Sequence, residues 1–274
     1  MNKTYTTSAI ILNRKDRGEA DRIFSLYTKD HGKIEAVATS ARKSTSKMAK
    51  FLESLMEIEL LLAKGKNYDK IAEVKLIDNF TELKQNSRLW ALGCYCIEVV
   101  DKLTKVEVPQ EDVFDLLKSI LNLLKSGNSS LIQFYVLKLL SKLGYSPRLD
   151  GCAVCEKRFE IIRAEQEHLV FSSEKGGVVC DKCLASKKGV GSIALASLRS
   201  VRDYGANGVR ISFSTVDFLR RGAVEELTFL QNIDINQWES REINRAISLL
   251  LNFHLDCGLN SARLISNQQQ VNGN

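Results

Sequence analysis

The chain lacks long apolar runs and the short motifs that mark common enzyme sites. No apolar stretch among its 274 residues approaches the roughly 20 that a membrane-spanning helix needs. The opening MNKTYTTSAIILNRKD places only a short apolar stretch before new charges, so we expect neither a signal peptide nor a membrane segment. A phosphate-binding GxxxxGK(S/T) loop, an HExxH helix and a GxSxG elbow are also missing. Because no Asp, Glu and His residues cluster along the chain, the sequence predicts that the protein is not an enzyme.

The composition indicates a folded protein with a basic N-terminal part. Apolar residues make up 44% and charged residues 26% of the chain, as in ordinary globular proteins, and the length favours more than one domain. The first 80 residues hold 15 Lys and Arg against 11 Asp and Glu, a surplus of 4 within a net charge of +6. Among seven cysteines, Cys94, Cys96 and Cys257 have no spacing partner, which is typical of a reducing compartment and predicts a cytoplasmic protein.

Residues 4 to 78 have the pattern of a small β-barrel. Short apolar or β-branched blocks, separated by charged or glycine-bearing turns, predict strands at 5–12, 21–28, 33–39, 55–63 and 68–77. Gly18, Gly32 and Gly65 fall between successive blocks, where a turn can use positive φ. Five strands in about 80 residues favour the oligonucleotide-binding (OB) fold, the commonest five-stranded barrel, although an SH3-like barrel fits the same pattern.

Beyond residue 80 the apolar period changes from that of strands to that of helices. Three- to four-residue spacing predicts helices in 90–103, 111–127 and 129–144, and again in 193–205, near 214–230 and in 238–258. A cysteine-bearing stretch at 150–187 interrupts this series. The sequence therefore predicts a multidomain α+β protein: a barrel at 1–80 and a helical domain at 81–266 with an inserted module at 150–187. The polar tail at 267–274 is expected to be disordered.

The inserted stretch begins and ends with Cys-x-x-Cys. The pairs are Cys152 with Cys155 and Cys180 with Cys183, separated by 24 residues, and together they supply the tetrahedral set of four thiolates that zinc prefers. Such a shell leaves no position for water or substrate, so we predict one structural rather than catalytic Zn²⁺. The alternatives are two chance pairs of buried thiols or a redox motif. Gly176 and Gly177 are predicted to form the turn that directs the second pair.

A basic loop, TSARKSTSKMAK at residues 39 to 50, follows the third predicted strand. Its cations, with no acidic residue among them, are Arg42, Lys43, Lys47 and Lys50, and its serines and threonine can hydrogen-bond phosphate oxygens. A solvated loop explains the charge equally well. On the rim of a small barrel, however, the loop favours nucleic-acid binding, with Phe24, Tyr27 and Phe51 as candidate stacking residues and core packing as the alternative for Phe24.

Several segments resemble one protein family. GEADRIFSLYTKDHGKIEAVATSARKSTSK at 18–47 is similar to the N-terminal signature of the bacterial RecO recombination and repair proteins. GYSPRLDGCAVC and FSSEKGGVVCDKC resemble the cysteine-bearing members, and HLDCGLNSARLI at 254–265 resembles the last helix of the family. The similarity spans nearly the whole chain. It departs at residues 38–41, where the family more often has glycine, and residues 205–237 match nothing that we can name.

The resemblance implies a non-enzymatic recombination mediator with an OB-fold barrel and a structural zinc module. Such a protein binds single- and double-stranded DNA without sequence specificity and anneals complementary strands. It acts near the nucleoid with RecR and the acidic tail of the single-strand-binding protein, and helps to load RecA. Carried over to this chain, the DNA role is assigned to Arg42, Lys43, Lys47 and Lys50, with Arg14, Arg17 and Lys33 as neighbours. The alternative is an RNA-binding protein built from an OB fold and a zinc module.

Overall fold

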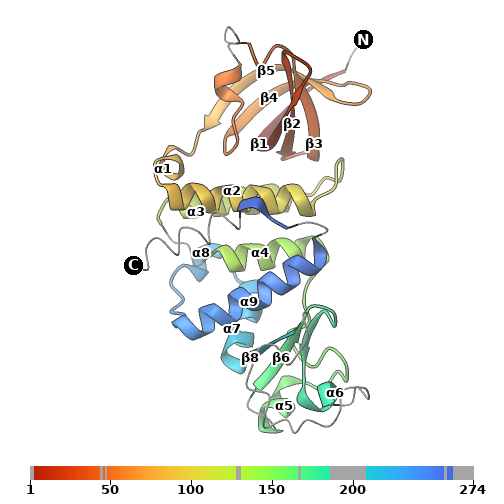
Figure 1. The fold of residues 1–274 in the computed structure, drawn as a ribbon, viewed down its shortest axis with the longest axis vertical. Helices are drawn as coiled ribbons and strands as arrows, with labels where there is room; N and C mark the ends of the chain where they lie inside the picture. Colours follow the sequence, from red (N-terminus) through yellow and green to blue (C-terminus); the bar gives the residue numbers. More distant parts are fainter. Residues whose placement is uncertain are drawn as a thin grey trace. The chain divides into compact units, whose positions relative to one another are not determined.

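The structure is a computed structural model that describes residues 3–43, 46, 48–127, 131–165, 168–185, 208–255 and 258–261 (Figure 1). The chain forms two compact units. The first combines Met1–Ile132 with the segment that starts at Leu259, and the second is Gln133–Gly258. The first unit extends beyond the predicted domain 1–80, because the helices that follow the barrel pack on its strands. Among the helices in the described ranges, none is long and apolar enough to cross a bilayer.

The N-terminal part is a closed five-stranded barrel, as predicted. Its strands are β1 (Thr4–Arg17), β2 (Asp21–Thr28), β3 (Gly32–Ala38), β4 (Glu57–Ala63) and β5 (Asp69–Asp78). They follow one another around the barrel in the order β1-β2-β3-β5-β4, with β1 pairing with both β2 and β4. Only the β3–β5 pairing is parallel. This order is that of the OB fold, so it decides against the SH3-like alternative. A short 3-10 helix, η1 (Ala49–Phe51), lies between β3 and β4.

The first strand is longer than the predicted 5–12. Its first half pairs with β4, and its second half continues through Arg14 to Arg17 alongside β2, with a register shift between Ile11 and Asn13. The sequence did not indicate this extension because the second half is polar and exposed. At the turns, Gly18 and Gly32 adopt positive φ values of 57° and 64°, as predicted, but Gly65 does not adopt a positive φ.

Two of the three aromatic side chains that were considered as base-stacking residues are fully buried. Phe24 belongs to the apolar core and is fully buried. Tyr27 is also fully buried, and its hydroxyl donates to the Gln110 carbonyl at 3.2 Å. Neither ring can reach a base, so the prediction for Tyr27 is wrong and the core alternative for Phe24 is confirmed. Phe51, on η1, is half-buried.

Three helices complete the first unit: α1 (Thr81–Lys84), α2 (Ser87–Leu103) and α3 (Glu111–Leu124). The side chain of Asn86 caps α2 by accepting from the amides of Arg88 and Leu89 at 3.0 and 3.2 Å. The first helix packs on the second, the second contacts β1, and the third contacts β2 and β3. The outer surface of the first three strands is therefore partly covered by helices.

The second unit contains helices around a three-stranded sheet. Its helices are α4 (Leu131–Lys142), α5 (Phe159–Glu165), α6 (Asp181–Ala185), α7 (Phe213–Val224), α8 (Leu227–Leu230) and α9 (Gln237–His254), and α4 begins two residues before the unit boundary. The strands β6 (His168–Ser172), β7 (Gly177–Val179) and β8 (Gly208–Ser212) have the order β7-β6-β8. The predicted helix at 193–205 and the tail at 267–274 lie outside the described residues.

The third strand of this sheet lies beyond the predicted end of the cysteine module at residue 187. Strand β8 pairs with β6 along all five of its residues. Glu242 of α9 then fixes this strand: its carboxylate accepts from the amide and hydroxyl of Ser212 at 2.9 and 2.7 Å, and from Trp238 Nε1 at 2.9 Å. The sheet therefore joins the cysteine-bearing segment to the helices that follow it within one unit.

Candidate nucleic-acid rim and metal site

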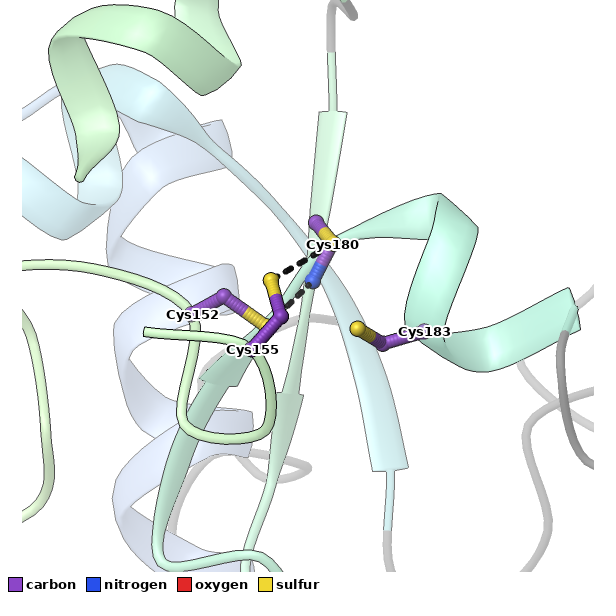
Figure 2. Close-up of side chains that lie close together, drawn as sticks. All are labelled: Cys152, Cys155, Cys180 and Cys183. Carbon is purple, nitrogen blue, oxygen red and sulfur yellow. Dashed lines mark hydrogen bonds between the residues drawn. The ribbon is translucent and has the colours of Figure 1, made fainter. Parts of the chain in front are cut away.

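Two parts of the second unit bring the paired cysteines together, as predicted. Cys152 and Cys155 lie on the loop before α5, and Cys180 and Cys183 lie where β7 passes into α6. Figure 2 shows the four side chains turned toward a common centre. The Ala153 amide donates to a backbone carbonyl of β7 at 2.7 Å, which holds the first loop against the strand that leads to the second pair.

The predicted glycine turn before the second pair is confirmed. Gly176 has a φ of +66°, a conformation that L side chains rarely adopt, and its carbonyl accepts from the Arg148 amide at 2.8 Å. Gly177 begins β7 at a point where the backbone of Arg148 approaches closely, since a Cβ at this glycine would lie 2.4 Å from the Arg148 carbonyl oxygen. Both glycines are therefore needed for the strand to reach the first loop.

The four sulfur atoms have the spacing that a single tetrahedral ion requires. All four lie within 4.8 Å of one another, and the Cys155 and Cys180 sulfurs are 3.9 Å apart. A zinc ion with Zn–S bonds of about 2.3 Å holds its sulfurs about 3.8 Å apart. Burial raises the pKa of the Cys152 thiol, but hydrogen bonds from the amides of Cys155, Cys180 and Val154 lower the pKa to about 7. The four sulfur atoms are therefore close enough together to hold one metal ion.

The start of the basic loop is fastened to the β1–β2 turn. Arg42 donates to the Gly18 carbonyl at 2.7 Å and lies 3.4 Å from the Asp16 carboxylate, which Arg22 also contacts at 2.9 Å. The hydrogen bond from Arg22 lowers the pKa of Asp16. The Ser40 amide donates to the Asp21 side chain at 2.8 Å. These contacts hold the loop beside the turn and surround one carboxylate with two guanidinium groups.

An aromatic residue that the sequence did not single out joins this basic group. Tyr68 lies in the β4–β5 turn, and the guanidinium of Arg17 lies over its ring at 5.3 Å from the centroid. We use the term rim for Arg17, Arg22, Arg42, Lys43 and Tyr68. In OB folds the β1–β2 and β4–β5 loops are the ligand-binding ones, and this general rule was the signal that could have identified Tyr68.

The structure places the predicted DNA-binding cations in different surroundings. Arg14, Arg17, Arg42, Lys43 and Lys50 are exposed, and the Lys50 ammonium lies 4.7 Å from the Phe51 ring centroid. Lys47 lies outside the described residues.

Lys33 differs from the other predicted cations because only 13% of its side chain is exposed. Its ammonium lies 2.9 Å from a carboxylate oxygen of Asp101 and also donates to the Asp101 carbonyl. This ion pair accounts for Lys33 as a residue that fastens α2 to the barrel.

Together these features define a class of protein: an OB-fold barrel with a basic rim, followed by a helical unit with four clustered cysteines that can hold a metal ion. Residues 1–80 match the family model described as Recombination protein O N terminal, and residues 85–263 match Recombination protein O C terminal. The chain belongs to the RecO family of DNA repair proteins.

Similar proteins cover almost the full length of the chain. A protein from Pelotomaculum thermopropionicum is 28% identical over 260 residues, which are 94% of this chain and 92% of that protein. One from Desulfitobacterium hafniense strain Y51 is 31% identical, over 94% of this chain and 87% of its own. One from Dehalococcoides mccartyi strain BAV1 is 31% identical, over 92% and 91%. Each of the three is named DNA repair protein RecO.

Proposed function

We propose that the protein is a non-enzymatic recombination mediator that binds single- and double-stranded DNA through its rim without reading the bases. The observation that carries this proposal is that three loops lie together. Arg17, at the β1–β2 turn, lies over the ring of Tyr68 in the β4–β5 turn, and Arg42 of the basic loop donates to the Gly18 carbonyl in the β1–β2 turn. Guanidinium groups neutralise phosphates, and a partly exposed aromatic ring offers a surface on which any base can stack. Neither kind of contact depends on the base sequence of the bound strand.

A surface of this kind can promote annealing. Two complementary strands repel each other through their phosphates, and a protein that neutralises part of this charge lowers the barrier to their encounter. We extend the proposal to the partners that membership of the family suggests: RecR, the acidic tail of the single-strand-binding protein, and RecA as the recombinase that is loaded. For the second unit we propose one Zn²⁺ on Cys152, Cys155, Cys180 and Cys183, with a structural role.

Salt-dependent DNA binding tests the rim. Arg17→Ala combined with Lys43→Ala removes two exposed cations and leaves the Arg42 side chain in place. With a fluorescent oligothymidylate, the slope of log affinity against log salt should become shallower by about 0.7 for each phosphate that the protein no longer neutralises. The matched control is Lys75→Ala on β5, an exposed lysine whose ammonium lies 3.6 Å from Glu59. A rim variant with the slope of the control would reject the rim as the DNA site.

The RNA-binding alternative is decided by the same titration. A rim that grips phosphates and stacks bases should treat DNA and RNA strands of one sequence alike, within a few-fold. A strong preference for RNA would instead support an RNA-associated role. Such a preference requires a contact with the 2′-hydroxyl, the group that distinguishes RNA from DNA.

A further inference from the structure

A polar pocket of about 230 Å³ lies in the first unit, on the barrel and beside the end of α2. Its lining comes from the first three strands and from the last turn of that helix: Asn13, Arg14, Lys15, Ile23, Ser25, Lys33, Glu35, Asp101 and Lys102. Asn13 pairs with Ser25 across β1 and β2, and Ser25 pairs with Glu35 across β2 and β3. Because Phe24 and Leu26 on either side of Ser25 point into the core, this row points outward.

The pocket occupies the face of the barrel that usually binds ligands in OB folds. That face is centred on the second and third strands, next to the loops that form the rim here. In this chain α2 and α3 cover part of it, as the burial of Tyr27 and Lys33 shows. The pocket is therefore the portion of the usual binding face that the helices leave open.

The acidic group at the base of the pocket is already neutralised. The Asp101 carboxylate accepts from Ser25 at 2.7 Å and from Asn13 at 3.4 Å, in addition to its ion pair with Lys33 at 2.9 Å. These three partners come from three different strands. Burial raises the pKa of Asp101, but the hydrogen bonds and the charge of Lys33 outweigh this effect and lower it, so the carboxylate stays ionised and paired.

The remaining charges of the pocket favour an anion. Arg14, Lys15 and Lys102 are all exposed, and Glu35 is the acidic lining residue that remains after Asp101 is paired with Lys33. Three positive charges against one negative charge leave a surplus of two. Lys15 and Arg17 are two residues apart on β1, or about 7 Å along a strand. A polynucleotide that leaves the rim along β1 thus meets the pocket next.

We propose that this pocket, between Lys15 on β1 and Lys102 on α2, holds a backbone phosphodiester of a DNA strand that is also bound at the rim. The inference builds on the proposed DNA-binding function and extends it to a second point of contact. It assigns a role to Lys102, which lies outside the barrel and which no feature of the sequence indicated. The helix is then part of the DNA track as well as a support for the barrel.

The test compares a pocket variant, Lys15→Gln with Lys102→Gln, with wild type, the rim variant and Lys75→Gln. The probe is a fluorescent oligothymidylate in a salt titration. We expect the pocket variant to bind several-fold more weakly at low salt, with a slope shallower by about 0.7 for each phosphate that is no longer neutralised. Lys102→Arg with native Lys15 should bind as wild type. Because Lys102 lies in the last turn of α2, where a cation favours the helix, the thermal midpoint is measured for each variant.

The outcomes separate this inference from the function on which it builds. If the rim variant loses affinity while a folded pocket variant binds as wild type, the pocket contact is wrong and the rim stands. If neither variant changes the slope, both proposals are wrong. If Lys75→Gln weakens binding as much as the pocket variant, the effect comes from overall charge and the pocket contact is also overturned.

Discussion

At the scale of single residues, Asp101 connects helix α2 to three strands of the barrel. Its carboxylate forms an ion pair with Lys33 and accepts hydrogen bonds from Ser25 and Asn13, three residues on three different strands. Only 13% of the Asp101 side chain is exposed. Removing its negative charge leaves the Lys33 ammonium with the Asp101 backbone carbonyl as an acceptor but without its ion-pair partner. The cost of breaking a buried pair in this way exceeds the value of the interaction itself, because the remaining charge stays desolvated.

We predict that Asp101→Asn lowers the free energy of unfolding at pH 7 by about 2 kcal/mol. Burial acts to raise the pKa of Asp101, but its hydrogen bonds and the charge of Lys33 hold the pKa below its ordinary value. A carboxyl whose pKa is lowered by folding stabilises the protein above its unfolded pKa, and this contribution disappears as the pH falls through the folded pKa. The difference between wild type and variant should therefore be largest above about pH 4 and shrink below it.

Urea unfolding at pH 7 and pH 3 measures this difference. The matched control is Asp115→Asn on α3, where the side chain is exposed and the change should matter little at either pH. An equal loss of stability at both pH values would contradict the electrostatic role of Asp101 and indicate that the variant only disturbs packing.

At this scale, residue types could be predicted from the sequence but their partners could not. The charge of Lys33 suggested a phosphate contact, but its partner Asp101 is 68 residues away and no local pattern links the two. Tyr27 looked like a stacking residue for a similar reason: its ring is suited to a base, and only the packed α3 shows that the ring is covered. The cysteine pairs could be predicted because each pair is local and because four cysteines that share one metal ion must lie close together.

At the scale of elements, the four-cysteine site joins a loop to the junction between strand β7 and helix α6. Strands β6 and β7 pair over three residues each, which is little for an isolated hairpin. Strand β8 adds five residue pairs to β6, and the metal ion proposed for the four cysteines would add a further constraint. We therefore expect the metal to stabilise the second unit far more than the first.

The metal prediction is that purified protein holds about one equivalent of zinc, and that Cys155→Ser releases it and lowers the thermal midpoint of the second unit. DNA binding at the rim should persist, since the rim belongs to the first unit. Metal analysis and differential scanning calorimetry measure these effects. Cys94→Ala, at a half-buried thiol of α2, is the matched control and should retain the metal. Less than about half an equivalent in wild type would refute the structural zinc.

Elements were predictable where their pattern was local. The five barrel strands and the helices α2, α3 and α9 follow clear apolar periods, so their positions agree with expectation apart from the polar extension of β1. Strand β8 was missed because GVRIS is only five residues long and its register depends on β6, far earlier in the chain. Short strands that complete a distant sheet carry too little periodicity to be identified alone.

For the whole molecule, the distribution of charge says more than its sum. The barrel region carries a surplus of 4 out of a total of +6. Four thiolates on one Zn²⁺ would lower the total to about +4 and make the middle of the chain slightly acidic. A protein that is basic at one part and near neutral elsewhere can hold DNA at the first unit while leaving the second for protein partners.

This division leads to a prediction for annealing. Two complementary strands, each coated with the cognate single-strand-binding protein, should anneal faster when this protein is added, with no nucleotide present. Charge neutralisation at the rim lowers the repulsion between strands, so raising the salt concentration should reduce the acceleration. The rim variant Arg17→Ala with Lys43→Ala should lose most of the effect, and Lys75→Ala should keep it. Quenching of a donor dye on one strand by an acceptor on the other follows the reaction.

The comparison with bare strands determines what a failure would mean. If the protein anneals bare strands but not coated ones, the rim works on DNA and the interaction with the coating protein is absent. If the protein binds bare strands tightly but anneals neither bare nor coated strands, it only binds single strands. The RNA-binding alternative then becomes stronger than the mediator proposal. Acceleration on coated strands that disappears in the rim variant would connect the convergence of Arg17, Tyr68 and Arg42 directly to the mediator function.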